Sequence, residues 1–140
     1  MDKLEIYNET NTETPNINFL ELKNEILGEN FDLTISILSG KNSQKINKKQ
    51  RKKDYIPNTL SFKYSENSGE IVMTPEVIDS EDYAIESKIL IDFQEKFLYL
   101  TIHSMLHLKD FDHSEEMEKL EEKYFKKFDI VLWYNKKIYE

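Results

Sequence analysis

Residues 97–108, FLYLTIHSMLHL, are apolar on almost every side of the helix that they predict. A helix with apolar side chains all the way round is usually buried in the middle of a domain. The helical pattern reaches back to residue 87 and forward to residue 109. We therefore expect one long central helix over residues 87–109, and this helix carries His103 and His107.

A second helix is predicted directly after the central one. A loop over residues 110–112 leads into a charged segment over residues 114–128, for which Asp112 or Ser114 can act as the N-cap. Apolar residues recur there every three to four positions and predict an inward face made of Met117, Leu120, Tyr124 and Phe128. Residues 129–140 are aromatic, and their pattern assigns them to no element.

Upstream, short strands alternate with helices. The apolar pattern predicts strands over residues 4–7, 31–38, 59–64 and 70–73. The last two strands are separated by a turn over residues 65–69 and form a hairpin. Helices are predicted over residues 17–27, with Gly28 at the C-terminal end, over residues 41–53, and from Pro75 onward. Residues 80–86 are polar and are predicted to be a loop. Strands interleaved with helices indicate an α/β or α+β layered fold.

Composition narrows the class of protein. A chain of 140 residues with 39% hydrophobic and 33% charged residues fits a single globular domain over residues 1–140, within which residues 129–140 stay unassigned. No run approaches the roughly 18 apolar residues of a membrane span, and no signal-peptide pattern follows Met1. Cysteine is absent, which excludes disulfides and thiolate metal sites. These features favour a cytoplasmic protein without a membrane partner.

Charge is unevenly distributed along the chain. The formal net charge of −8 argues against nucleic acid as a partner, because binding to phosphates depends on Lys and Arg. Residues 41–53, KNSQKINKKQRKK, nevertheless carry seven basic residues and no acid. This segment is either a nucleic-acid-binding patch or a solvated helix face.

All three histidines of the chain fall within residues 103–113. His103 and His107 are four residues apart and share one face of the predicted helix, and the following turn can bring back His113. Three imidazoles suit zinc and leave a fourth position open for water, as in catalytic sites. Nickel or cobalt would accept the same ligands. The alternative is a set of structural histidines, but unpaired imidazoles on an apolar helix are costly. We therefore predict one metal ion per chain.

The histidine spacing is also similar to the HExxH pattern of metalloproteases. Those sites place a glutamate general base directly after the first histidine. Here that position is Ser104, and no glutamate lies between His103 and His113. A zinc hydrolase acting on peptides is therefore the weaker interpretation.

The stretch over residues 103–113, HSMLHLKDFDH, resembles the HGxLHLxGYDH motif of the YbeY family. Residues 46–54 (INKKQRKKD) are similar to the family's LNxxYRGKD segment, residues 60–62 (LSF) to its VLSFP strand, and residues 69–72 (GEIV) to its GDIVI strand. The order and approximate spacing agree over residues 30–128, which is most of the chain.

The resemblance implies a metal-dependent, single-strand-specific endoribonuclease of ribosomal RNA maturation. It implies a small mixed sheet packed with helices around the histidine helix, with the metal at the mouth of a cleft. His103, His107 and His113 would hold Zn²⁺, and His107 and Arg51 would be needed for catalysis. The lysines that flank Arg51 would contact RNA together with it: Lys48, Lys49, Lys52 and Lys53. The partners would be ribosomal RNA or a ribosomal subunit, with ribosomal or assembly proteins.

Two further functions stay open beside this one. The first is a ribosome-assembly factor that binds RNA around a structural zinc, and the second is a zinc hydrolase of another substrate. Without the resemblance, Arg51 is one more solvated cation, and Ser61 and Phe62 are ordinary strand residues. The chain also departs from the family pattern, which has glycine at three positions occupied here by Ser104, Asp110 and Lys52. If position 110 needs a positive φ, aspartate is among the better substitutes for glycine.

Overall fold

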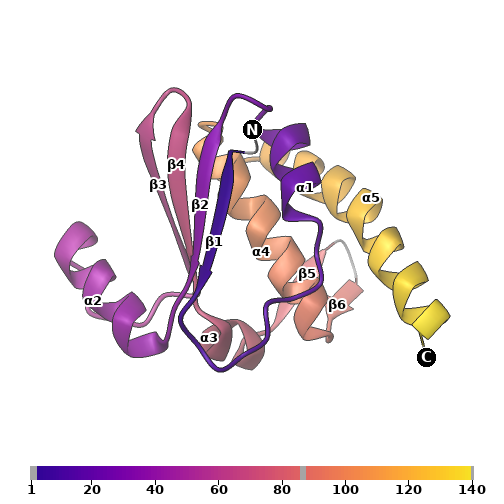
Figure 1. Cartoon of the computed structure of the whole chain (residues 1–140), viewed down its shortest axis with the longest axis horizontal. Helices are drawn as coiled ribbons and strands as arrows, with labels where there is room; N and C mark the ends of the chain where they lie inside the picture. Colours follow the sequence, from indigo (N-terminus) through magenta and orange to yellow (C-terminus); the bar gives the residue numbers. More distant parts are fainter. Residues whose placement is uncertain (1–2, 86–87, 140) are drawn as a thin grey trace.

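The computed structural model describes residues 3–85 and 88–139, with side chains up to residue 129. A four-stranded sheet consists of β1 (Leu4–Asn8), β2 (Asp32–Ile37), β3 (Thr59–Ser65) and β4 (Ser68–Met73). The helices are α1 (Phe19–Ile26), α2 (Gly40–Arg51), α3 (Pro75–Ser80), α4 (Phe93–Leu108) and α5 (Glu115–Tyr139). Helices α1, α4 and α5 lie on one side of the sheet and α2 on the other (Figure 1). The molecule is a single α/β domain, as predicted.

The sheet is mixed, with strand order β1-β2-β4-β3. Strand β2 runs parallel to both β1 and β4, whereas β3 and β4 form the predicted antiparallel hairpin. The alternation predicted for β2 is confirmed, because Leu33, Ile35 and Ile37 are buried and the residues between them are not. Strand β3 lies at an edge of the sheet, so one side of it is free to line a cleft.

Helix α4 is central, as its apolar sequence predicts. Phe97, Leu98 and Ile102 are completely buried in the main hydrophobic core. The helix also contacts β3 closely at Ser104, which is fully buried. The Ser104 hydroxyl lies 2.8 Å from the Thr59 hydroxyl, and Ser61 donates to the Ser104 carbonyl at 3.3 Å. A small side chain at position 104 thus lets the histidine helix pack against the edge strand.

The start of α4 corrects the sequence prediction. The helix begins at Phe93 instead of residue 87, because Asp92 caps it by accepting the backbone N–H of Gln94 at 2.7 Å. The predicted loop and first helical turn instead contain an antiparallel pair, β5 (Tyr83–Ile85) and β6 (Lys88–Leu90). Residues 86 and 87 themselves lie outside the described residues. In the stretch KILI only Leu90 is buried, between the exposed Ile89 and Ile91, and the neighbouring helical signal obscured this short strand.

Helix α5 begins as predicted, with the Ser114 hydroxyl accepting the backbone N–H of Met117 at 3.1 Å. Its buried face is rotated by about one position from the prediction. Leu120 and Tyr124 pack only half-buried against the core, while the buried positions of the helix are Met117, Glu121, Phe125 and Phe128. The backbone of residues 129–139, which the sequence left unassigned, continues this helix. No helix among the described residues has both the length and the apolar content to cross a bilayer.

Candidate metal centre

His103 and His107 lie one turn apart on the face of α4 that looks toward β3. Both are half-buried, and their ring centroids are 4.5 Å apart. Their Nε2 atoms approach to 3.0 Å, so both rings direct this nitrogen toward the same point. The helical spacing of the two residues therefore produces the convergence that the sequence predicts.

A tight turn at the end of α4 brings back His113. The backbone N–H of Phe111 bonds to the Leu106 carbonyl at 3.1 Å, and that of Asp110 to the His107 carbonyl at 3.0 Å. This pair of bonds is a Schellman motif, which requires a left-handed residue, and Asp110 supplies it with φ of 68°. The exposed His113 ring then lies 5.2 Å from the His103 ring and 4.9 Å from the His107 ring, between centroids.

The three histidines fit a metal ion. One nitrogen from each lies within 4.8 Å of the others, whereas a tetrahedral zinc with bonds of ~2.0–2.1 Å needs nitrogens about 3.3 Å apart, a small adjustment. The outward Nδ1 atoms of two rings have partners, because that of His103 lies 2.9 Å from Glu121 Oε1 and that of His107 donates to the Phe111 carbonyl at 3.0 Å. Such partners fix the tautomer that leaves the inner nitrogen unprotonated.

Electrostatics also favour the metal-binding form of these rings. Burial lowers the pKa of His107, and the neighbouring His103 lowers it further. A histidine with a lowered pKa stays neutral to a lower pH, and only the neutral imidazole binds a metal. The triad can therefore hold a metal ion, and three nitrogen ligands are those that zinc accepts.

Sequence reasoning missed Glu121, a buried carboxylate behind His103. Its side chain is 8% exposed and contacts the ring of His103 and the hydroxyl of Tyr99. Burial raises the pKa of Tyr99 to about 12, and the negative charge of Glu121 adds to the rise. Its spacing indicates an inward position, because it follows Met117 by four residues on the buried face of α5. A glutamate within a highly charged helix is nevertheless expected to be exposed, and this obscured its role.

Replacing Glu121 with alanine is expected to weaken zinc binding by about 10- to 100-fold, the usual effect of removing the partner of a ligating histidine. Glu121→Gln keeps an oxygen acceptor for His103 and should lose less. The measurement is zinc affinity by competition with a chromophoric chelator, with Glu116→Ala, an exposed acid on the same helix, as the control. Equal affinities in Glu121→Ala and wild type would show that Glu121 does not orient His103.

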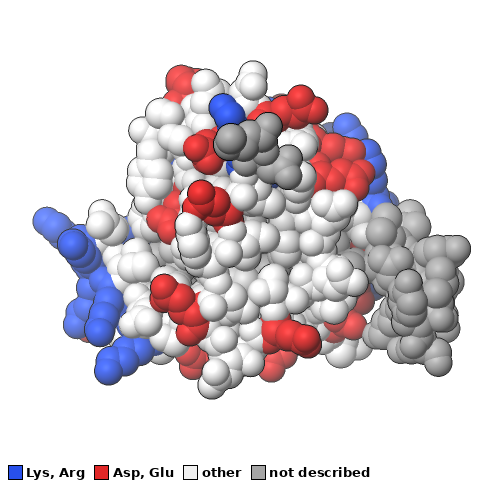
Figure 2. Space-filling view, in the orientation of Figure 1, with Lys and Arg blue, Asp and Glu red and all other residues white. Residues whose placement is uncertain are grey.

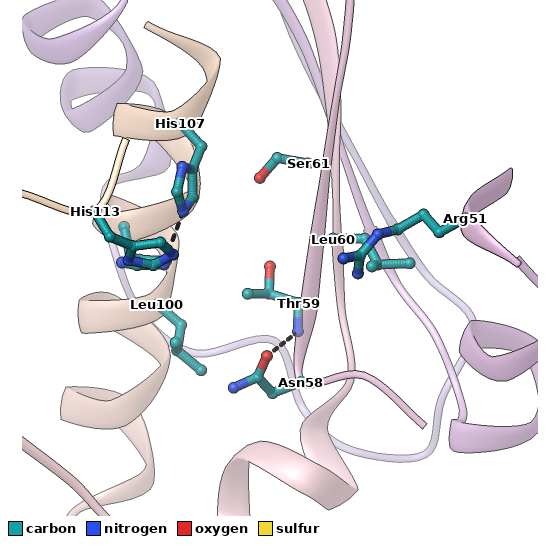
Figure 3. A pocket seen from close by; sticks show the side chains of 9 residues that line it. Arg51, Asn58, Thr59, Leu60, Ser61, Leu100, His107 and His113 are labelled. Atoms are coloured by element: carbon teal, nitrogen blue, oxygen red, sulfur yellow. Dashed lines mark hydrogen bonds between the residues drawn. The ribbon is translucent and has the colours of Figure 1, made fainter. Parts of the chain in front are cut away.

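A cavity of about 400 Å³ opens beside the triad. Its lining residues are Arg51, Asn58, Thr59, Leu60, Ser61, Leu100, His103, His107 and His113. In Figure 3 the side chains of Ser61 and Thr59 on β3, and of Asn58 directly before it, point toward the histidine helix α4, and the Arg51 guanidinium extends toward the cavity from the opposite side of the strand. Among these lining residues there is no carboxylate, so the cavity presents an environment for an anion.

Arg51 is held in place by its own helix and the loop that follows. Its Nη1 atom donates to Asn47 Oδ1 at 3.4 Å and to the Tyr55 hydroxyl at 3.3 Å. Asn47 is fully buried, and its amide donates to the Tyr55 carbonyl at 3.0 Å. The helix ends at Arg51, and the C-cap residue Lys52 turns the chain with a left-handed conformation (φ of 57°).

The other residues proposed for RNA contact lie outside the cavity. Lys48, Lys49, Lys52 and Lys53 are exposed along α2 and its C-terminal end, and Lys48 pairs with Asp54 at 3.2 Å. Figure 2 shows the Lys and Arg side chains gathered over α2 at one end of the molecule, with Asp and Glu dispersed over the rest of this face. Phe62 does not line the cavity and packs instead with Leu38, Leu60 and Val72 in a second hydrophobic cluster. The overall negative charge thus coexists with a basic surface beside Arg51.

Comparison with known proteins shows to which family the chain belongs. A family model described as endoribonuclease YbeY matches residues 2–129. The chain belongs to the YbeY family. It is similar to the protein named endoribonuclease YbeY of Thiobacillus denitrificans, with 31% identity over 114 residues, covering 74% of this chain and 75% of that protein. The protein of the same name from Francisella philomiragia is 30% identical over 139 residues, covering 84% and 85%.

The fold is also found among solved structures. The solution structure of TM1509 from Thermotoga maritima superposes with a TM-score of 0.68 at 23% identity, covering 94% of this chain and 93% of that one. This likeness supports the α/β fold predicted from the resemblance to the YbeY family.

The three departures from the YbeY motif are accommodated. Lys52 and Asp110, which replace glycines of that motif, are the two non-glycine residues with positive φ in the described part of the chain. A left-handed conformation costs an L-residue roughly 1–2 kcal/mol. Asp110 also gains a partner in Lys63 at 2.7 Å, which ties the turn to β3. At the third position, Ser104 fits the contact with β3 and adds a hydrogen bond to Thr59.

Proposed function

We propose that this protein is a zinc-dependent, single-strand-specific endoribonuclease that acts in ribosomal RNA maturation. The observation that carries the proposal is that a histidine triad able to hold a metal ion and the guanidinium of Arg51 line the same cavity. A cation on each side of a cavity without a lining carboxylate suits a phosphodiester. Membership of the endoribonuclease YbeY family supports RNA as the polymer that carries it.

In the proposed reaction, different residues around the cavity bind the metal and the phosphate. His103, His107 and His113 hold the zinc, which when bound supplies a Lewis acid toward phosphate and water. Arg51 binds the phosphate with two N–H groups and stabilises the charge that develops there. Apart from these residues, no lining side chain titrates near neutral pH, so protons enter and leave through water.

A peptide is the less suitable substrate. The position that carries the general base in HExxH enzymes is Ser104, a buried hydroxyl that bonds to Thr59 and is not among the cavity-lining residues. Glu121 lies behind His103 and does not line the cavity. Neither residue can activate water for attack on a carbonyl.

The basic surface on α2 supplies the remaining contacts. Lys48, Lys49, Lys52 and Lys53 are exposed on the same helix as Arg51 or directly after it, and Figure 2 shows the basic side chains gathered over this helix. Such a basic surface suits the backbone of ribosomal RNA or of a ribosomal subunit.

The test is cleavage of a single-stranded RNA and of its duplex by the purified chain. We expect cleavage of the single strand that stops on chelation and returns when zinc is restored. Metal content is measured on the same samples, with nickel and cobalt tried as substitutes. RNA binding without cleavage at any metal loading would instead indicate an assembly factor with a structural zinc.

A further inference from the structure

The loop after α2 exposes an aromatic side chain directly beside Arg51. Tyr55 is 51% exposed, and the next residue, Ile56, is 40% exposed. Together they form an exposed apolar surface just after a segment that is rich in lysine. An exposed apolar surface beside a cationic cavity is complementary to a ligand that is anionic in one part and flat and apolar in another.

The Tyr55 side chain is fixed in place by polar contacts with α2. Its hydroxyl accepts a hydrogen bond from Arg51 at 3.3 Å, and its carbonyl accepts one from the buried amide of Asn47 at 3.0 Å. Asn47 also accepts from Arg51 at 3.4 Å, which closes the set of contacts. The Gln44 amide ties the same loop to α2 by donating to the Asp54 carbonyl at 3.3 Å. The ring is thus held beside the guanidinium while much of it stays open to solvent.

We propose that Tyr55 is a stacking platform for a base of single-stranded RNA, adjacent to the phosphate that Arg51 binds. This inference rests on the proposed function and adds the residue that selects unpaired RNA. Proteins that bind single strands combine a cationic groove with aromatic rings, and every base offers a face to stack. A paired base is covered by its neighbours in the helix and cannot use the ring.

The contact between Tyr55 and Arg51 also indicates where this base would bind relative to the cavity. Arg51 lines the cavity, whereas Tyr55 is outside the cavity lining and contacts the guanidinium through its hydroxyl. A nucleotide on Tyr55 would therefore flank the phosphate in the cavity on the α2 side. The exposed lysines of α2, which Figure 2 shows gathered over this helix, would follow the backbone of the same strand.

The experiment measures equilibrium binding of zinc-loaded protein to a labelled single-stranded RNA and to a duplex of the same length. A gel confirms that the RNA stays intact during each titration. The variants are Tyr55→Leu, Tyr55→Phe and, as a matched control, Tyr64→Leu. Tyr64 is also exposed, at 66%, and its hydroxyl also bonds to a charged side chain, Glu70, but it lies on β3 outside the cavity lining.

We expect Tyr55→Leu to weaken single-strand binding by about 10-fold, within the range for loss of one stacked base. Tyr55→Phe and Tyr64→Leu should stay within about 2-fold of wild type, because ring stacking does not need the hydroxyl. Duplex binding should not change. The slope of affinity against salt should also be the same in Tyr55→Leu and wild type, because stacking releases no counterions.

Three results would overturn the inference: Tyr55→Leu binding the single strand like wild type, an equal loss on the duplex, or an equal loss in Tyr55→Phe. The last would assign Tyr55 to positioning Arg51 through its hydroxyl. Cleavage assayed in parallel separates the two proposals. The Tyr55 pattern without cleavage by any protein would leave stacking standing and refute the nuclease, whereas cleavage with no Tyr55 effect would do the reverse.

Discussion

Zinc binding by His107→Ala is expected to fall by on the order of 1,000-fold or more relative to wild type, with RNA cleavage reduced to the level of the chelated protein. His107 is the middle member of the triad, within 4.9 Å of both other rings by centroid distance. Without it, two imidazoles remain, and two ligands rarely retain zinc against water and buffer. Metal content per chain by mass spectrometry measures the effect, with about one zinc expected in wild type.

The matched control for this variant is Lys109→Ala, an exposed position just after the last residue of the same helix. It should keep wild-type zinc and activity. Thermal unfolding of both metal-free proteins tests whether the loss is local, and we expect similar curves because half-buried His107 contributes little to the core. A full zinc complement in His107→Ala would show that the triad is not the metal site. Absence of zinc from wild type, even after incubation with it, would do the same.

The fold was predictable where one periodicity dominates. The continuous apolar run of α4 and the strict alternation in β2 each match a single element. Prediction was wrong where two patterns meet. The pair β5 and β6 directly precedes α4, and residues on both sides of Asp92 are apolar, so the helical signal extended too far upstream. The decisive feature is the cap at Asp92, a single hydrogen bond that periodicity does not register.

The candidate site was predictable to the extent that it is local in the chain. His103, His107 and His113 converge through one helical face and one turn, which spacing alone describes. Glu121 and Asn47 act through the packing of α5 on α4 and of a loop on α2, and no local pattern carries that information. Arg51 is intermediate. Only the family resemblance distinguished it from its neighbouring lysines, and the role of Arg51 in catalysis stays a prediction.

Substitution of Arg51 is expected to have the second large effect. Arg51→Ala is expected to lower the rate of RNA cleavage by about 100- to 1,000-fold, the range for loss of one group that stabilises transition-state charge. Zinc content should be unchanged, because Arg51 lies across β3 from the histidines and contacts none of them in the structure. Single-turnover cleavage with saturating protein measures the chemical step apart from RNA binding.

Arg51→Lys discriminates between charge and geometry. Lysine preserves the charge but presents one ammonium group instead of a planar fork, so it should recover only part of the lost rate. Lys45→Ala, which removes an exposed cation six residues earlier on α2, is the control for general attraction of RNA. It should reduce affinity modestly and lower the salt dependence without changing the single-turnover rate. An Arg51→Ala variant that behaves like Lys45→Ala would make Arg51 one more solvated cation.

The same comparison bears on why the chain can be acidic overall and still act on RNA. If the rate depends on Arg51 and binding on the lysines of α2, the charges that matter are confined to one end of the molecule. The net charge of −8 then comes from surfaces that the RNA does not touch. At a Debye length of about 8 Å in physiological salt, those distant acids are largely screened. A local cluster of cations beside the metal can therefore bind a polyanion despite the charge of the whole chain.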